Sequence, residues 1–141
     1  MRTLGLDFGQ KTIGVAVSDP FGWTAQGVEI IRRDKEESIN KSILRIGEII
    51  KQYDVLKIVL GYPKNMNNTV GERGQKTEDF KKKLEKSFPN IEIVLWDERL
   101  STVGAERSLL EADLSRKKRK DVIDKMAAVF ILQGYLDCVS K

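Results

Sequence analysis

Three carboxylates stand at positions where packing gives little reason for a charge. Asp7 ends an alternating apolar segment just before a glycine, Glu98 closely follows an apolar run at residues 91–96, and Asp124 precedes Ala127 and Ala128 in a largely apolar stretch. Converging carboxylates form a hard oxygen-ligand site suited to Mg²⁺ or Mn²⁺. Two such ions support phosphodiester hydrolysis. Because the chain contains no histidine, a histidine-based triad or proton shuttle is excluded.

Each carboxylate also has a structural explanation, and spacing in the sequence does not decide between the two. Asp7 could cap its own turn through a local hydrogen bond. Asp97 could start a helix, with Glu98 and Arg99 forming a surface pair. Asp124 could be an exposed charge near a helix N-terminus, favoured by the helix dipole. A shared metal site is therefore a hypothesis at this stage.

Basic residues accompany the acidic ones, and the net charge of +4 with a pI near 9.2 suits a polyanionic partner. The loop at residues 61–74 leads from a predicted strand into a helix, whose first N–H groups favour phosphate oxygens; a purely structural connector is the alternative. The basic run at residues 116–120 could bind a nucleic-acid backbone by counterion release, or could simply be solvated, as we expect for Lys81, Lys82 and Lys83. The candidate nucleic-acid contacts are Lys11, Lys64, Arg73, Arg99, Arg116, Lys117, Lys118, Arg119 and Lys120.

Apolar periodicity predicts the elements that must position these residues. Alternation with a period of two predicts strands at residues 2–8 and 12–19, and less clearly at 24–32. Two further strands are expected at residues 57–60 and 91–96. Helical spacing predicts helices at residues 35–52, 72–86, 101–114 and 121–139, with a basic linker at 115–120 before the last helix.

This order predicts an α/β fold whose mixed five-stranded sheet begins with three antiparallel strands, continues with parallel strands and is flanked by helices. The length fits a single domain over residues 1–141. No apolar run is long enough to cross a membrane, and a strand is expected directly after Met1, so we expect a cytoplasmic protein. Cys138 has no partner cysteine and is interpreted as a buried or half-buried small residue.

Four segments, taken together in order and spacing, resemble the YqgF/RuvX family. They are Leu6-Asp7-Phe8-Gly9 through Ile13-Gly14-Val15-Ala16-Val17-Ser18-Asp19, the Gly61-x-Pro63 loop, Asp97-Glu98-Arg99-Leu100-Ser101-Thr102, and residues 120–132 with Asp124-x-x-Ala127-Ala128. The resemblance spans almost the whole chain.

The resemblance implies a ribonuclease H-like fold and a nuclease, named in that family both as a Holliday-junction-resolvase-like protein and as an enzyme maturing the 5′ end of pre-16S rRNA. It matches Asp7, Glu98 and Asp124 to the family's acids, with Asp97 as a possible fourth metal ligand. Asn68 stands where many relatives have glycine, a tolerable change because asparagine also accepts left-handed backbone geometry.

Other functions remain open. Asp7-x-Gly9 followed by Ile13-Gly14 also resembles the first phosphate loop of actin-like and sugar-kinase ATPases, but this chain has no second such loop. A nucleic-acid-binding module without turnover, linked to transcription or ribosome biogenesis, would keep the basic run and tolerate loss of the carboxylates. Structured RNA and branched DNA are both candidate substrates, and junction resolution would require a homodimer with two active sites.

Overall fold

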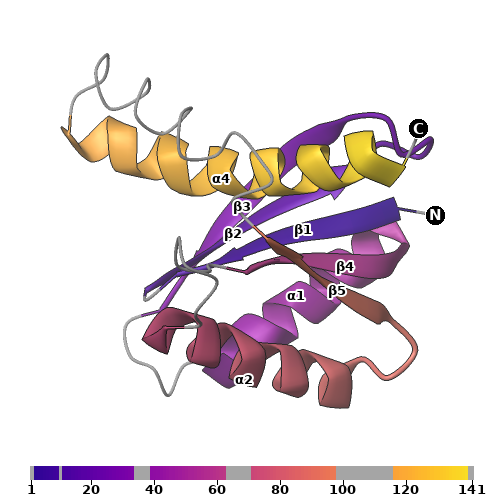
Figure 1. Cartoon of the computed structure of the whole chain (residues 1–141), viewed down its shortest axis with the longest axis horizontal. Coiled ribbons are helices and arrows are strands. Elements are labelled where there is room, and N and C mark those ends of the chain that lie inside the picture. Colours follow the sequence, from indigo (N-terminus) through magenta and orange to yellow (C-terminus); the bar gives the residue numbers. More distant parts are fainter. Residues whose placement is uncertain (1, 10, 34–38, 63–70, 98–115, 140–141) are drawn as a thin grey trace.

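The computed structural model describes residues 2–9, 11–33, 39–62, 71–97 and 116–139 (Figure 1). For residues 72–73 and 116–125 it describes the backbone alone. The predicted helix at residues 101–114 lies outside the described residues. Within the part of the chain that is described, no helix is both long and apolar enough to span a bilayer.

A five-stranded sheet forms the centre of the molecule, in the order β3-β2-β1-β4-β5. The first three strands are antiparallel neighbours, whereas β4 runs parallel to both β1 and β5. This arrangement confirms the predicted mixed sheet. The strands are β1 (Arg2–Phe8), β2 (Thr12–Ser18), β3 (Ala25–Arg32), β4 (Val55–Tyr62) and β5 (Glu92–Asp97).

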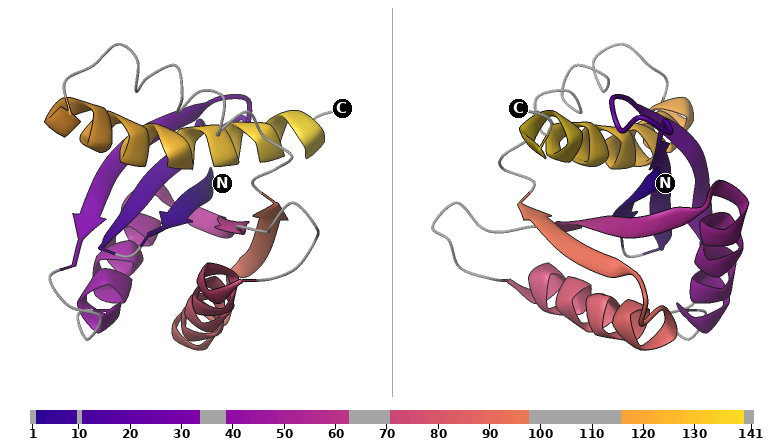
Figure 2. Two further views of the ribbon diagram at one scale, coloured as in Figure 1. Left: turned by 60° about the vertical axis from the view of Figure 1, so that its left-hand side comes forward. Right: turned by 90° about the vertical axis from the view of Figure 1, so that its right-hand side faces the viewer.

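Helices cover both faces of the sheet. The helix α4 (Arg116–Val139) lies along one face, and α1 (Ile39–Tyr53) and α2 (Glu72–Ser87) lie against the other (Figures 1 and 2). Alternation along each strand explains this division, because successive side chains point to opposite faces. Leu4 and Leu6 enter the core beneath α1 and α2, whereas Ala16 and Val59 pack beneath α4.

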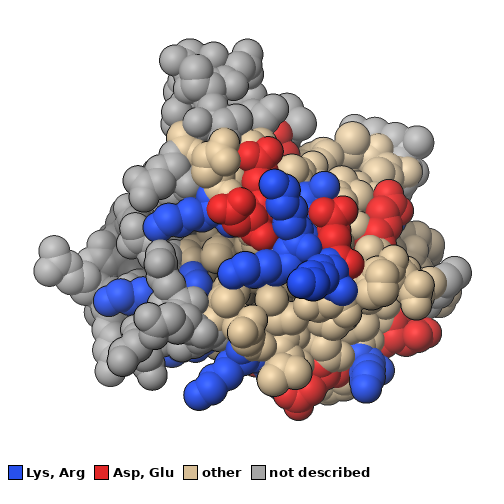
Figure 3. Space-filling view, turned by 90° about the horizontal axis from the view of Figure 1, so that it is seen from below, with Lys and Arg blue, Asp and Glu red and all other residues tan. Residues whose placement is uncertain are grey.

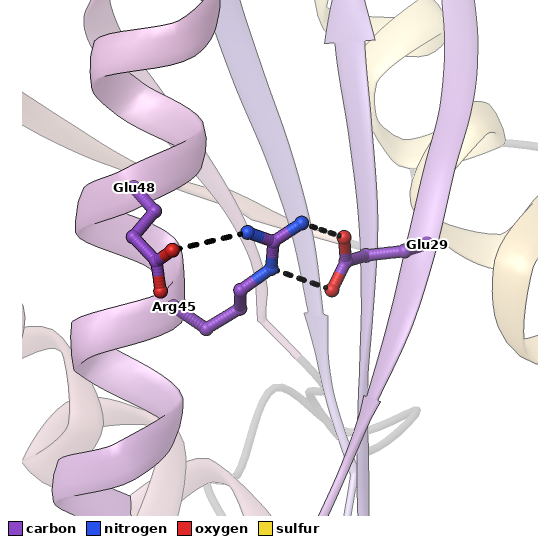
Figure 4. Close-up of polar contacts among 3 residues, drawn as sticks. All are labelled: Glu29, Arg45 and Glu48. Atoms are coloured by element: carbon purple, nitrogen blue, oxygen red, sulfur yellow. Dashed lines mark hydrogen bonds and ion pairs between the residues drawn. The ribbon is translucent and has the colours of Figure 1, made fainter.

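The face that carries α1 and α2 has side chains of both charges. Lysine and arginine side chains lie among aspartate and glutamate side chains there (Figure 3). One ion-paired group joins α1 to the sheet: Arg45 donates from Nε and Nη2 to both carboxylate oxygens of Glu29 at 3.0 and 2.6 Å, and Nη1 reaches Glu48 at 3.4 Å (Figure 4). The hydrogen bond to Glu29, together with the charge of that carboxylate, raises the pKa of Arg45. The bidentate pair fixes the position of α1 along β3.

Two predictions about the C-terminal region are wrong. Residues 116–120 form the first turns of α4 rather than a linker, because lysine and arginine are good helix formers and no glycine or proline interrupts the run. Cys138 is exposed rather than buried, since α4 directs Leu132 and Leu136 toward the sheet and leaves its last turn in solvent.

Candidate metal centre

The carboxyl ends of β1, β4 and β5 meet at one edge of the sheet. Leu6 pairs with Leu60, which pairs with Leu95, so the three strands are in lateral register. Asp7 is the next residue of β1, and Asp97 is the last residue of β5. The fold therefore brings these two predicted residues to the same edge, where open α/β sheets usually bind ligands.

Asp7 lies on the α4 face of the sheet. Its neighbours Leu6 and Phe8 pack into the core beneath α1 and α2, and the Phe8 ring stacks on Phe80 of α2 at 4.3 Å between centroids. Alternation then places Gly5 and Asp7 on the opposite face. Asp7 is half-buried on the face that α4 covers.

Asp97 lies on the other face of the sheet from Asp7, as the alternation of side chains along β5 shows. Ile93 and Leu95 pack on the core beneath α1 and α2, whereas Trp96 packs beneath α4. The pleat thus places Asp97 on the face opposite to Asp7. Its cross-strand neighbour is Tyr62, and burial, reinforced by the charge of Glu78 on α2, raises the pKa of that phenol.

Contacts along α4 show that the helix runs antiparallel to β1 and β4. Tyr135, near the end of α4, accepts a hydrogen bond at 3.0 Å from Lys57, near the start of β4. Earlier in the helix, Leu132 and Ala128 lie over Gly5: a Cβ added at Gly5 would be 2.7 Å from the Leu132 Cβ and 3.1 Å from the Ala128 carbonyl oxygen. The first half of α4 therefore lies over the carboxyl end of β1.

Asp124 occupies the turn of α4 that precedes Ala128. Ala127 and Ala128, the small residues that follow Asp124 in the sequence, are almost fully buried against the sheet. Only the backbone of Asp124 is described. Glu98 directly follows the last residue of β5 and lies outside the described residues.

The predicted nucleic-acid contacts fall into three groups. Lys11 is exposed in the turn between β1 and β2, shortly after β1, the strand that carries Asp7, ends at Phe8. Arg73 and residues 116–120 are described as helical backbone in the first turns of α2 and α4. Lys64 and Arg99 lie outside the described residues.

Sequence reasoning missed Arg33, which follows β3 and contacts the turn next to Asp7. Its guanidinium donates to the Gly9 carbonyl at 2.6 Å and lies 4.7 Å from the Phe8 ring centroid. Its exposed fraction is only 6%. A charged residue at the end of an apolar strand is an ordinary surface pattern, so the sequence offers no signal that distinguishes this one.

The donor set suits a hard divalent cation. Among the described side chains, no group of three aspartate, glutamate, cysteine or histidine residues gathers around one point. Asp7 is the member of the predicted trio whose side chain is described, and it is half-buried. Carboxylate oxygens are the ligands that Mg²⁺ and Mn²⁺ prefer, so the residues assigned to this site fit such an ion.

Comparison with known proteins gives a consistent result at the level of sequence. The family model described as "RuvX: Holliday junction resolvase" matches residues 1–138. A Bacillus pumilus protein named "Putative pre-16S rRNA nuclease" is 59% identical over 140 residues, covering 99% of this chain and 100% of the relative. A Staphylococcus carnosus protein of the same name is 60% identical over 136 residues, covering 96% and 95%.

Solved structures with low sequence identity share the fold. RuvC of T. thermophilus, solved with a Holliday junction substrate, aligns with a TM-score of 0.62 at 11% identity, covering 99% of this chain and 97% of that one. The yeast mitochondrial Holliday junction resolvase Ydc2 aligns with a TM-score of 0.53 at 10% identity, covering 95% and 77%. The predicted ribonuclease H-like fold is confirmed.

Proposed function

Because this chain belongs to the RuvX family, we propose that it is a metal-dependent nuclease that hydrolyses phosphodiester bonds in structured nucleic acid. We propose maturation of the 5′ end of pre-16S rRNA as its role, acting in the cytoplasm as a single domain. Relatives with 59–60% identity over nearly the whole chain are named "Putative pre-16S rRNA nuclease", which supports this choice of substrate.

The observation that carries the proposal is the antiparallel course of α4 over β1. From the contact between Gly5 and Ala128, Asp7 lies two strand residues further along, a distance of about 6 to 7 Å. Asp124 lies four helical residues from the same contact in the same direction, a distance of about 6 Å. Asp7 shares a strand face with Gly5, and Asp124 shares a helix face with Ala128. The two acidic positions are thus expected to oppose one another.

We assign Asp7, Glu98 and Asp124 as the catalytic carboxylates and as ligands for Mg²⁺ or Mn²⁺. Glu98 is the next residue in the sequence after Asp97, and we assign it on the match of Asp97-Glu98-Arg99 to the family's acidic segment. Asp97 is a candidate fourth ligand, and its place on the opposite face argues for a supporting position instead. Bound Mg²⁺ or Mn²⁺ would activate the attacking water and stabilise the leaving oxygen.

The protein's own residues then position the substrate. Lys11 is exposed beside the strand end that carries Asp7, and we assign it a contact with a backbone phosphate. The basic first turns of α4, residues 116–120, lead directly into the turn that carries Asp124. Positive charge there would hold the phosphodiester backbone next to the carboxylates. Lys64, Arg73 and Arg99 complete the proposed set of phosphate contacts.

Resolution of branched DNA is the second candidate activity. The description of the matching family names Holliday junction resolvase, and the fold is that of RuvC. This activity requires two active sites that act on opposite strands, and so a symmetric homodimer. A nucleic-acid-binding module without turnover is the third candidate.

One experiment separates the three candidates. The purified protein is incubated with an RNA that spans the 5′ end of pre-16S rRNA and with a four-way DNA junction, each with Mg²⁺, with Mn²⁺ or with chelator. The proposal predicts metal-dependent cleavage of the RNA. Cleavage of the junction alone would favour the resolvase, and tight binding of either substrate without cleavage would favour the binding module. Cleavage that persists in chelator would contradict the metal mechanism.

A further inference from the structure

We propose that Arg33 is a positioning residue that fixes the turn between β1 and β2 and thereby the location of Asp7. The inference rests on the proposed function, since it takes Asp7 to be a metal ligand. Arg33 lies on the face of the sheet that α1 and α2 cover, against the Phe8 ring. We assign it no contact with substrate or metal.

Arg33 holds both sides of the turn. Its Nη2 donates to the Gly9 carbonyl at 2.6 Å, and its backbone N–H donates to the Lys11 carbonyl at 2.7 Å. The turn is also closed by a hydrogen bond of 2.8 Å from the Gly9 N–H to the Thr12 carbonyl. The described residues on either side of position 10 are therefore tied to the end of β3.

The guanidinium is held in place by a stack of rings. Its Cζ lies 4.7 Å from the centroid of Phe8, and Phe8 in turn stacks on Phe80 with an interplanar angle of 26°. A cation desolvated over an aromatic face is stabilised by the ring quadrupole, and the bond to Gly9 offsets part of the cost of burial. Arg33 is 94% removed from solvent and so has few alternative side-chain conformations. It therefore holds the turn in one position.

Arg33 constrains the position of Asp7 because Asp7 lies between two residues whose positions are fixed. Leu6 is fully buried on one side, and Phe8 and Gly9 are held by Arg33 on the other. The turn is tight, since a Cβ at Gly9 would lie 3.1 Å from the Thr12 carbonyl oxygen. Metal sites tolerate ligand displacements of only about 0.5 Å. Loosening the Gly9 carbonyl should therefore lower metal affinity without removing any ligand.

The test measures Mn²⁺ affinity in the absence of nucleic acid, by electron paramagnetic resonance of the free ion, for Arg33→Met, Arg33→Lys and Asp7→Asn. Arg33→Met should weaken binding about tenfold, in the range found for residues that orient metal ligands. Arg33→Lys, which keeps a donor for Gly9 but loses the planar stack, should recover part of that loss. Hydrogen exchange at the Gly9 amide should be slowest in the wild type, faster in Arg33→Lys and fastest in Arg33→Met.

Arg45→Met is the matched control. It removes an arginine of α1 that is also joined to β3, through its pair with Glu29 (Figure 4). This pair makes no contact with the β1–β2 turn in the hydrogen bonds of the described residues. Mn²⁺ affinity should stay at the wild-type value. Chemical denaturation shows whether each variant is folded, and if Arg33→Met does not fold, Arg33→Lys decides the question.

The outcomes separate this inference from the proposed function. Wild-type Mn²⁺ affinity and unchanged Gly9 exchange in folded Arg33 variants, together with loss of binding in Asp7→Asn, would overturn the positioning role and leave the metal site intact. Equal Mn²⁺ affinity of the wild type and Asp7→Asn would instead overturn the metal site. A drop in affinity as large in Arg45→Met as in Arg33→Met would also overturn the inference, because it would reflect a general loss of stability.

Discussion

Gly5 of β1 and Leu132 of α4 approach so closely that no larger residue fits at position 5. A Cβ built on Gly5 would lie 2.7 Å from the Cβ of Leu132, and the Ala128 carbonyl oxygen would be 3.1 Å away. This close approach sets the height of α4 above the sheet. It therefore also sets the distance between the positions of Asp7 and Asp124, on which the proposed metal site depends.

Substitution of Gly5 by alanine is expected to force α4 away from the sheet. The clash involves a Cβ and a backbone oxygen, which cannot move as the end of a flexible side chain can, so we expect destabilisation of about 1–3 kcal/mol and a loss of metal-dependent cleavage. Urea denaturation measures the first effect. Gly47→Ala is the control: the same change within α1 meets only the Phe88 ring at 3.3 Å and gains helix propensity. Equal stability of Gly5→Ala and wild type would contradict the packing argument.

The buried phenol of Tyr62 should make the protein sensitive to alkaline pH. Burial, with the charge of Glu78 in addition, raises the pKa of Tyr62 above its usual value of about 10. A group whose folded pKa is raised contributes stability that is fully present below the unfolded pKa and is lost as the pH rises through the folded pKa. The free energy of unfolding should therefore fall above about pH 10. In Tyr62→Phe this fall should be smaller, as measured by denaturant titrations from pH 8 to 11. Parallel curves for the two proteins would show that Tyr62 does not contribute.

The basic first turns of α4 should determine how binding depends on salt. Lys117→Gln, Lys118→Gln and Arg119→Gln together should reduce the slope of log K against log salt by about 2 to 3, if each cation neutralises one phosphate. Binding assays with the pre-16S rRNA fragment from 50 to 200 mM salt give the slope. The same triple change at Lys81, Lys82 and Lys83 of α2 is the control and should leave the slope unchanged. If the variant at residues 117–119 also kept the wild-type slope, those side chains would be merely solvated.

The helical state of this basic run gives it a further property. A helix N-terminus carries partial positive charge, and α4 has no acidic residue in its first turn to offset it. The run is therefore electrostatically unfavourable in the free protein. A bound polyanion should protect the amides of residues 116–120 from hydrogen exchange more than those of residues 131–136, and equal protection would contradict a direct contact.

Most of the sheet could be predicted from the sequence, because alternation is a local signal. The positions of Leu4, Leu6, Ile13 and Val15 predict which side chains share one face of the sheet, and all four lie in the core beneath α1 and α2. Strand boundaries are predicted less accurately, because β4 extends over Val55–Tyr62 rather than residues 57–60. Lys57 separates Val55 and Leu56 from the apolar run that follows it. In the fold, the amine of Lys57 donates a hydrogen bond to Tyr135.

The site could be predicted only in part. The paired alanines after Asp124 are small, and α4 packs closely on the sheet at Ala127 and Ala128. The opposite orientation of Asp97 follows from the exact register of β5, which the sequence does not reveal. The role of Arg33 depends on a contact between a turn and a strand end that are distant in sequence, so no local pattern contains it.

The most direct test of the metal site compares Asp7→Asn with Asp97→Asn. The two substitutions are chemically identical and lie at the same edge of the sheet, but the pleat places them on opposite faces. Initial rates of Mn²⁺-dependent cleavage of the pre-16S rRNA fragment should fall by more than about 100-fold in Asp7→Asn and by much less in Asp97→Asn, because Asp97 is in a supporting position on the other face. Wild-type cleavage by Asp7→Asn would contradict the central claim.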